Sequence, residues 1–182
     1  MLKKLAVLMC LYAAGSMAQV ASAVPDEWKP LQFLIGTWEA RTSGGSAQAA
    51  SSGTYSFQFE LGNHVIVRQI SKGGCKGPAD FDCGHNDLLY IYRENSQPTP
   101  KAIYFDSEGH VIHYDLSIPA PTSVVFLSDS SQPGPQFRLS YDLKGTTMYG
   151  KFEIRMPGET QFKPYLEWSG GKAVAHKNNS PH

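Results

Sequence analysis

The sequence lacks an excess of either charge. It carries 16 basic and 16 acidic residues, which sum to a formal net charge of zero. A protein that binds nucleic acid or an anionic membrane usually displays a basic surface, because positive charge provides the attraction. Neither partner is expected here. The sequence also lacks an apolar segment of the roughly 20 residues that a membrane-spanning helix needs, so no membrane span is expected.

Recognised catalytic motifs are absent as well. The sequence contains no Gly-x-Ser-x-Gly, no His-Glu-x-x-His, no phosphate-binding loop and no dinucleotide fingerprint. Isolated acidic residues such as Glu39, Glu153 and Glu167 are interpreted as solvated strand positions. These absences favour a non-enzymatic role, although a fold by itself does not decide between binding and catalysis.

A metal site is not expected from the histidines. His110 and His113 form a His-x-x-His pattern, but on a strand residues three apart point to opposite faces and do not converge on one ion. His113 and Asp115 share a face, which the pattern marks as the more polar one. His113 and Asp115 are therefore interpreted as solvated surface residues.

Only three cysteines are present, and the first, Cys10, falls in a segment that has the features of an export signal. Lys3 and Lys4 form its basic start, residues 5–14 its apolar core, and residues 21–23 a small-residue cleavage site. Residues 1–23 are therefore predicted to be a signal peptide. We expect a periplasmic or secreted protein, with one domain over residues 24–174 and a flexible tail over residues 175–182.

The two remaining cysteines, Cys75 and Cys83, lie close together among turn residues. In an exported protein such a pair favours one disulfide that pins a loop. A redox or metal-binding pair is disfavoured because the spacing is not Cys-x-x-Cys.

What the sequence does contain is alternation of apolar and polar residues with a period of two. From Gly53, the apolar positions Tyr55, Phe57 and Phe59 alternate with polar ones, which predicts a strand with one buried face. A two-residue turn at Gly62-Asn63 then pairs Phe57 with Arg68. Arg68 is consequently predicted on the inner face.

Two further hairpins follow the same pattern. A turn at Glu108-Gly109 is predicted to pair Phe105 with Ile112, which places Tyr104 on the outer face. A turn at Lys144-Gly145 is predicted to pair Tyr141 with Met148, with Arg138 outside.

Roughly ten strands are predicted in total, with a short helical cap before them over residues 25–34 that carries Trp28, Leu31 and Leu34 on one side. The predicted fold is all-β, an antiparallel up-and-down barrel wide enough to hold a small ligand. A two-sheet sandwich is the alternative.

The tripeptide Gly36-Thr37-Trp38, placed before this succession of strands, resembles the opening of the calycin barrels. These include lipocalins, fatty-acid-binding proteins, and nitrobindin-related bacterial "GTW" barrels. The resemblance implies that Gly36 and Trp38 are structural and that Trp38 closes one end of the barrel. It also implies a basic side chain over the indole, for which Lys172 is the first candidate and Arg155 the second.

Haem is the one cofactor that the resemblance raises. The nitrobindin-like proteins carry a longer glycine-rich signature and a haem-ligating histidine near the C-terminus. Here Trp38 is followed by Glu39-Ala40-Arg41, without the alternating glycines, although His176 lies near the end of the chain. Five-coordinate haem needs a neutral imidazole in an apolar pocket. A haem-binding barrel therefore stands as an alternative.

Arg68 is the most informative candidate site residue. An unpaired guanidinium on an inner face is costly, so it should meet a carboxylate, a group of hydroxyls or a bound anion. The functional hypothesis is that it binds the acidic head of a small apolar ligand. The alternative is that Arg68 pairs within the protein or reaches water at the rim. Residues proposed to assist it in ligand binding are His64, Tyr55, Tyr114, Tyr141 and Trp38.

The sequence thus predicts an exported barrel that binds a small hydrophobic or amphipathic molecule in its interior. A protein-interaction or inhibitor module that acts through the loop between Cys75 and Cys83 is a second possibility, and a small cavity enzyme is a third.

Overall fold

The computed structural model describes residues 24–94, 97, 99–131 and 133–174. The predicted signal peptide and C-terminal tail, with His176, lie outside the described residues. The described chain forms one 3₁₀ helix and ten strands. They are η1 (Asp26–Leu34), β1 (Gly36–Gly44), β2 (Ala50–Glu60), β3 (Val65–Lys76), β4 (Asp87–Tyr92), β5 (Lys101–Asp106), β6 (Val111–Ala120), β7 (Ser123–Ser128), β8 (Gln136–Lys144), β9 (Thr147–Arg155) and β10 (Lys163–Gly171).

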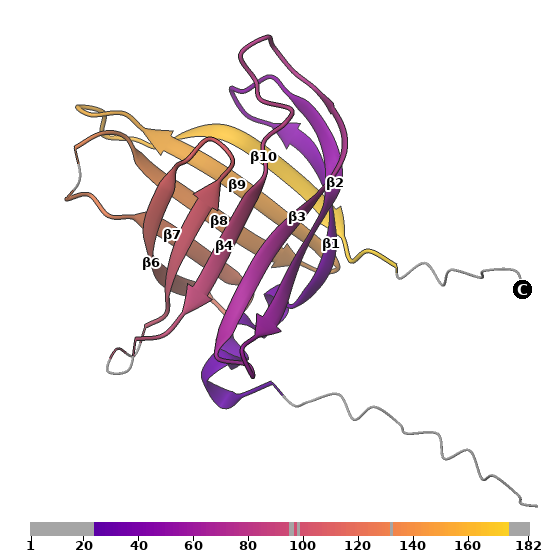
Figure 1. The fold of residues 1–182 in the computed structure, drawn as a ribbon, viewed down its shortest axis with the longest axis vertical. Coiled ribbons are helices and arrows are strands. Elements are labelled where there is room, and N and C mark those ends of the chain that lie inside the picture. The colour runs from indigo at the N-terminus through magenta and orange to yellow at the C-terminus, as the bar shows by residue number, and fades with distance from the viewer. Residues whose placement is uncertain (1–23, 95–96, 98, 132, 175–182) are drawn as a thin grey trace, which may run out of the picture.

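The ten strands close into one antiparallel barrel. Each strand pairs with the next along the chain, and β1 pairs with β10 to complete the circle (Figure 1). Closure leaves no edge strand with unpaired backbone groups. The predicted all-β up-and-down barrel with a short helical cap is confirmed, and the sandwich alternative is excluded.

The β2–β3 hairpin has the register that its alternation predicts. Phe57 pairs with Arg68 and Phe59 pairs with Ile66. Phe57 and Ile66 are fully buried, and Arg68 is only 7% exposed. Arg68 therefore lies on the inner face of the barrel.

The β5–β6 hairpin differs from the prediction by one residue. Tyr104, rather than Phe105, pairs with Ile112, because three residues rather than two form the connection after Asp106. Gly109, at φ +88°, supplies the left-handed residue that such a three-residue loop requires. A shift by one inverts a strand, so Tyr104 faces inward and Phe105 is 40% exposed outside.

The β8–β9 hairpin is shifted by two residues from the predicted register. Tyr141 pairs with Gly150 rather than Met148, which leaves the inner face unchanged. Arg138 lies outside as predicted and makes two hydrogen bonds to Glu153, at 2.6 and 2.9 Å. Glu153 was expected to be solvated but is only 5% exposed, because this ion pair covers it.

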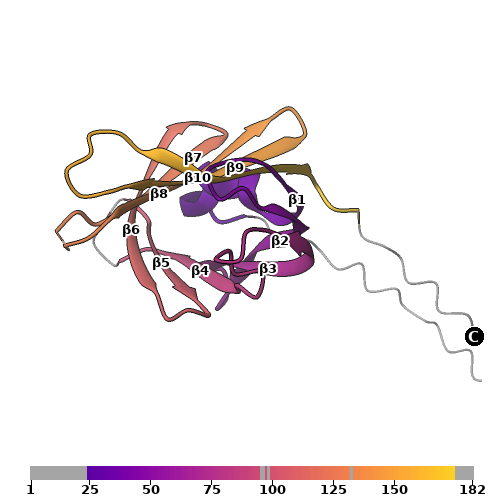
Figure 2. The same ribbon diagram turned by 90° about the horizontal axis from the view of Figure 1, so that it is seen from above.

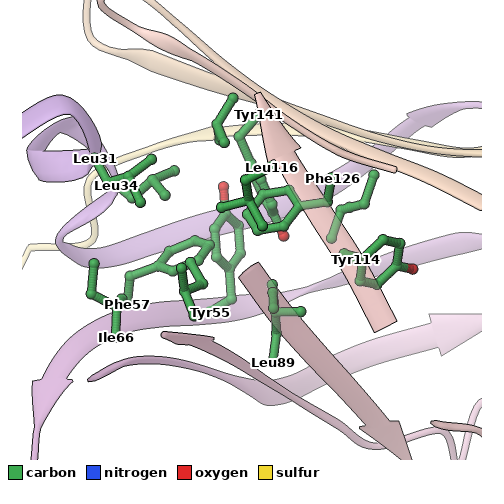
Figure 3. Packing of buried hydrophobic residues seen from close by; sticks show 14 of the residues in the cluster. Leu31, Leu34, Tyr55, Phe57, Ile66, Leu89, Tyr114, Leu116, Phe126 and Tyr141 are labelled. Atoms are coloured by element: carbon green, nitrogen blue, oxygen red, sulfur yellow. The ribbon is translucent and has the colours of Figure 1, made fainter. Parts of the chain in front are cut away.

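Helix η1 closes one end of the barrel. Trp28, Leu31 and Leu34 recur every third residue, the repeat of a 3₁₀ helix, so they align on one face, where each is at most 1% exposed. Seen from above, the strands encircle the interior and η1 lies across its far end (Figure 2). Leu31 and Leu34 reach into the buried cluster that contains Phe57 and Tyr141 (Figure 3).

The Gly36-Thr37-Trp38 motif lies beside this closed end. Gly36 has φ +125°, a conformation that a residue with a side chain rarely adopts. The Trp38 indole is 1% exposed and donates a hydrogen bond to the Leu34 carbonyl oxygen at 2.7 Å. Lys172 places its Nζ 5.2 Å from the indole centroid, whereas the Arg155 guanidinium instead lies over Phe162. The motif thus joins the cap, the first strand and the last.

Candidate functional site

A cavity of about 430 Å³ lies in the half of the barrel opposite η1. The β1–β2, β3–β4 and β5–β6 connections stand at this open end, two of them rising together at the top of Figure 1. The cavity is lined from within by β1 to β6 and by β8 to β10, and at its mouth by the β3–β4 and β5–β6 connections. Its volume is in the range of small-molecule sites.

Two opposite walls of the cavity differ in character. Strands β8, β9 and β10 contribute the apolar wall, which consists of Phe137, Leu139, Phe152, Tyr165, Leu166 and Trp168. Strands β3 to β5 lie across the barrel from it. With the adjoining loops, they contribute the polar wall, which consists of Arg68, Asp82, His85, Asp87, Tyr104, Asp106, Glu108 and His110. The cavity is therefore amphipathic from side to side.

Arg68 and Asp87 form an ion pair inside the barrel. Arg68 Nη1 donates to Asp87 Oδ1 at 2.5 Å, and both side chains are 9% exposed. Burial disfavours both charges, but each partner offsets this for the other, so the pKa of Arg68 is raised and the pKa of Asp87 is lowered. Arg68 is thus paired internally, the alternative that the sequence left open. Its Nε, however, is buried without a hydrogen-bond partner among the described residues.

His85 connects this pair to the mouth of the cavity. Its Nε2 is 2.9 Å from the Tyr104 hydroxyl and 3.6 Å from Asp87 Oδ2, an ionic contact that is too long for a hydrogen bond. Its Nδ1 is 2.9 Å from Glu108 Oε1. Asp87, against the opposing effect of burial and with help from Glu108, raises the pKa of His85 to about 9. The imidazole is therefore protonated at neutral pH and donates from both nitrogens.

Three tyrosines place hydroxyl groups around the cavity. Burial raises the pKa of Tyr55 to about 12 against the opposing charge of Arg68, and burial also raises the pKa values of Tyr104 and Tyr114. All three are neutral at physiological pH. The Tyr55 hydroxyl is buried without a hydrogen-bond partner among the described residues. The Trp168 indole N–H lies near it, but outside hydrogen-bond geometry.

The structure brings three of the predicted binding residues to the cavity, namely Arg68, Tyr55 and Tyr114. Tyr141 lies beneath it in the core, with its ring centroid 5.3 Å from that of Phe57, and its hydroxyl is also without a partner in the described structure. The other two predicted residues lie elsewhere. Trp38 is in the core beside the cap, and His64 is exposed in the β2–β3 turn at the closed end.

Several residues of the site were missed from the sequence. Tyr104 was placed outside by the one-residue error in the β5–β6 register. His85 lies in a loop and Trp168 in a strand, and neither belongs to a sequence motif that indicates a binding site. Asp87 could have been found, since a buried arginine requires an acidic partner and Asp87 begins the neighbouring strand.

The disulfide between Cys75 and Cys83 is present, as predicted. It closes the loop that carries Phe81 and Asp82 to the cavity mouth. Ligand atoms of Asp82, His85 and Glu108 all lie within 4.8 Å of one another, close enough for a cation to contact all three. Protonated His85 already neutralises one of the two carboxylates.

Neither of the two histidines that line the cavity has the surroundings of a haem-ligating imidazole. Both ring nitrogens of His85 are engaged, by Tyr104 and Glu108, and the ring is charged at neutral pH. The His110 side chain is 62% exposed at the mouth and contacts Asp106, so it lacks the apolar surroundings that haem ligation requires.

The fold and the cavity define a closed ten-stranded antiparallel barrel with an amphipathic interior site at one end, compatible with a calycin-like fold. No protein-family model matches the chain, and no curated protein matches it either. Within the described residues, no helix is long and apolar enough to cross a membrane.

Proposed function

We propose that this protein binds a small hydrophobic or amphipathic molecule in the cavity of the barrel. The observation that carries the proposal is the cavity of about 430 Å³ with an apolar wall on β8 to β10 and a polar wall across from it. Binding sites for small molecules combine such apolar surface with a few polar groups that orient the ligand. Tyr104 and Tyr114 provide neutral hydroxyls for this purpose.

We further propose that the protein is an exported member of the calycin-like barrels. The Cys75–Cys83 disulfide supports an oxidising compartment, because disulfides rarely persist in the cytosol. Gly36, Trp38 and Lys172 support the calycin-like assignment through the contact of a lysine with the motif tryptophan.

The disulfide-closed loop favours the cavity as the place of function. Phe81 and Asp82 from this loop line the cavity mouth. The loop therefore contributes part of its surface to the interior site. This supports a role in enclosing a ligand over a role as an independent protein-interaction module.

The proposal is tested by native mass spectrometry and by a neutral fluorescent probe, N-phenyl-1-naphthylamine. Protein purified without denaturation should carry an added mass that disappears on denaturation, and delipidated protein should enhance the fluorescence of the probe. Ile70 lines the cavity, while its neighbour Gln69 is exposed outside. Ile70→Trp should abolish the enhancement, because the indole fills the space that the probe needs. The matched variant Gln69→Trp should retain it. Equal probe binding by both variants would place binding outside the cavity.

A further inference from the structure

The positive and negative charges of the residues that line the cavity do not cancel. The acidic ones are Asp82, Asp87, Asp106 and Glu108, and the basic ones are Arg68, His85 and His110. With His85 charged and His110 neutral, the sum is 2 − 4 = −2, and protonation of His110 still leaves −1. The lining is therefore negative whichever form His110 takes. This negative charge disfavours a ligand with an acidic head, which the inward position of Arg68 suggested.

The excess negative charge lies at the mouth rather than at depth. Arg68 is neutralised by Asp87 inside the barrel, at 2.5 Å. At the mouth, Asp82 from the disulfide-closed loop and Glu108 from the β5–β6 connection meet one cation, His85, with all three within 4.8 Å. This trio carries a net charge of −1, so one additional monovalent cation would neutralise it.

The cavity next to this trio is built for an apolar body. Phe152, Leu166 and Trp168 line the wall opposite the charged groups. Deeper in the cavity, Tyr55 is 2% exposed and its hydroxyl has no hydrogen-bond partner in the described structure. A buried hydroxyl without a partner is costly and indicates a polar group that a bound molecule could satisfy.

We propose that the ligand of this cavity is a cationic amphiphile, with an amine head between Asp82 and Glu108 and an apolar body against the wall of β8 to β10. This inference rests on the proposed binding function and specifies the chemistry of the ligand. Carboxylates accept the N–H groups of an ammonium head directly, and they repel the carboxylate of a fatty acid.

The test compares three ligands that share one chain and differ in the head: decylamine, decanol and decanoate, each below its micelle-forming concentration at pH 7. Isothermal titration calorimetry on the full mature protein measures each affinity. Decylamine should bind about tenfold more tightly than decanoate, since attraction of one head and repulsion of the other each contribute about as much as an exposed ion pair. Decanol should fall between them.

Substitutions then show which residues cause the preference for decylamine over decanoate. In Asp82→Asn with Glu108→Gln, the charge of the trio changes from −1 to that of His85 alone, so the ratio of decylamine to decanoate affinity should fall to one or below, while decanol binding stays unchanged. Both replacements keep an acceptor for the existing bonds to the Gly84 N–H and to His85. Glu39→Gln, which removes one charge from the exposed outer surface, should leave the ratio as in the unsubstituted protein.

The outcomes separate this inference from the function on which it rests. Decanoate binding as tightly as decylamine, or a ratio that survives the double substitution, would overturn the cationic head while leaving small-molecule binding in place. Failure of all three ligands, together with failure of the neutral probe, would overturn both.

Discussion

The charge of Arg68 is held inside the barrel by a single carboxylate, that of Asp87. Replacing Arg68 with Leu leaves this buried carboxylate with only its longer contact to His85, so the free energy of unfolding should fall by about 3 kcal/mol. Removing both charges, as Arg68→Leu with Asp87→Leu, should recover much of that loss. Urea unfolding of the four proteins in this cycle measures the coupling. Additive losses would show that the pair does not act as a unit.

His85 makes stability depend on pH in a defined direction. Its pKa is about 9 in the folded protein, against about 6.5 when unfolded. Because the folded value is the higher one, the stabilisation is complete below about pH 6.5 and is lost as pH rises through about 9. His85→Gln should therefore destabilise strongly at pH 6 and little at pH 9.5, as measured by urea midpoints.

The control for that experiment is His113→Gln, which replaces an exposed histidine on the outer face. Its midpoint should follow that of the unsubstituted protein across the same pH range. A difference in urea midpoint between His85→Gln and the unsubstituted protein that stays constant from pH 6 to pH 9.5 would contradict the ionic contacts assigned to His85. The lowest pH of the experiment, pH 6, lies well above the acid range. In that range protonation of Asp87, whose pKa is lowered, would add its own pH dependence to the stability.

At the scale of elements, the disulfide and the loop that it closes form one unit with the cavity mouth. Changing both Cys75 and Cys83 to Ser should lower the free energy of unfolding by roughly 2–3 kcal/mol, because the unfolded chain regains the freedom of the loop. It should also weaken decylamine binding, since Asp82 is then less well positioned. Reduction of the unsubstituted protein should reproduce both effects. Unchanged binding after reduction would separate the loop from the site.

At the scale of the whole molecule, the residues that stabilise the closed end of the barrel and the residues of the proposed binding site lie at opposite ends. Trp28 plugs the closed end, with its Nε1 donating to the Asn63 carbonyl oxygen at 2.8 Å. Trp28→Ala should cost about 3–5 kcal/mol in urea unfolding, while the protein that remains folded keeps its affinity for N-phenyl-1-naphthylamine. Tyr149→Ala, at an exposed aromatic on the outer wall, should cost far less. A parallel loss of probe affinity in Trp28→Ala would show that the two ends are coupled.

Local pattern in the sequence was sufficient to determine the strands, the antiparallel order and the cap. Alternation with a period of two decides which face of a strand is apolar, and the spacing of Trp28, Leu31 and Leu34 decides the buried side of η1. The inward position of Arg68 followed from the same alternation. The two nearby cysteines were enough to predict the disulfide, because a short loop keeps them close.

Only the tertiary structure decided the composition of the site. Whether Tyr104 faces into or out of the barrel depends on whether the β5–β6 loop has two residues or three. The apolar pattern of β5 does not indicate the length of that loop. His85 lies just before β4, Asp87 begins β4, and Glu108 lies in the β5–β6 connection. Barrel closure sets them across from Trp168. The sum of charge around a cavity is a property of residues that meet in space. Local sequence determines the elements because their patterns are short-range, whereas the chemistry of the cavity depends on how distant elements are brought together.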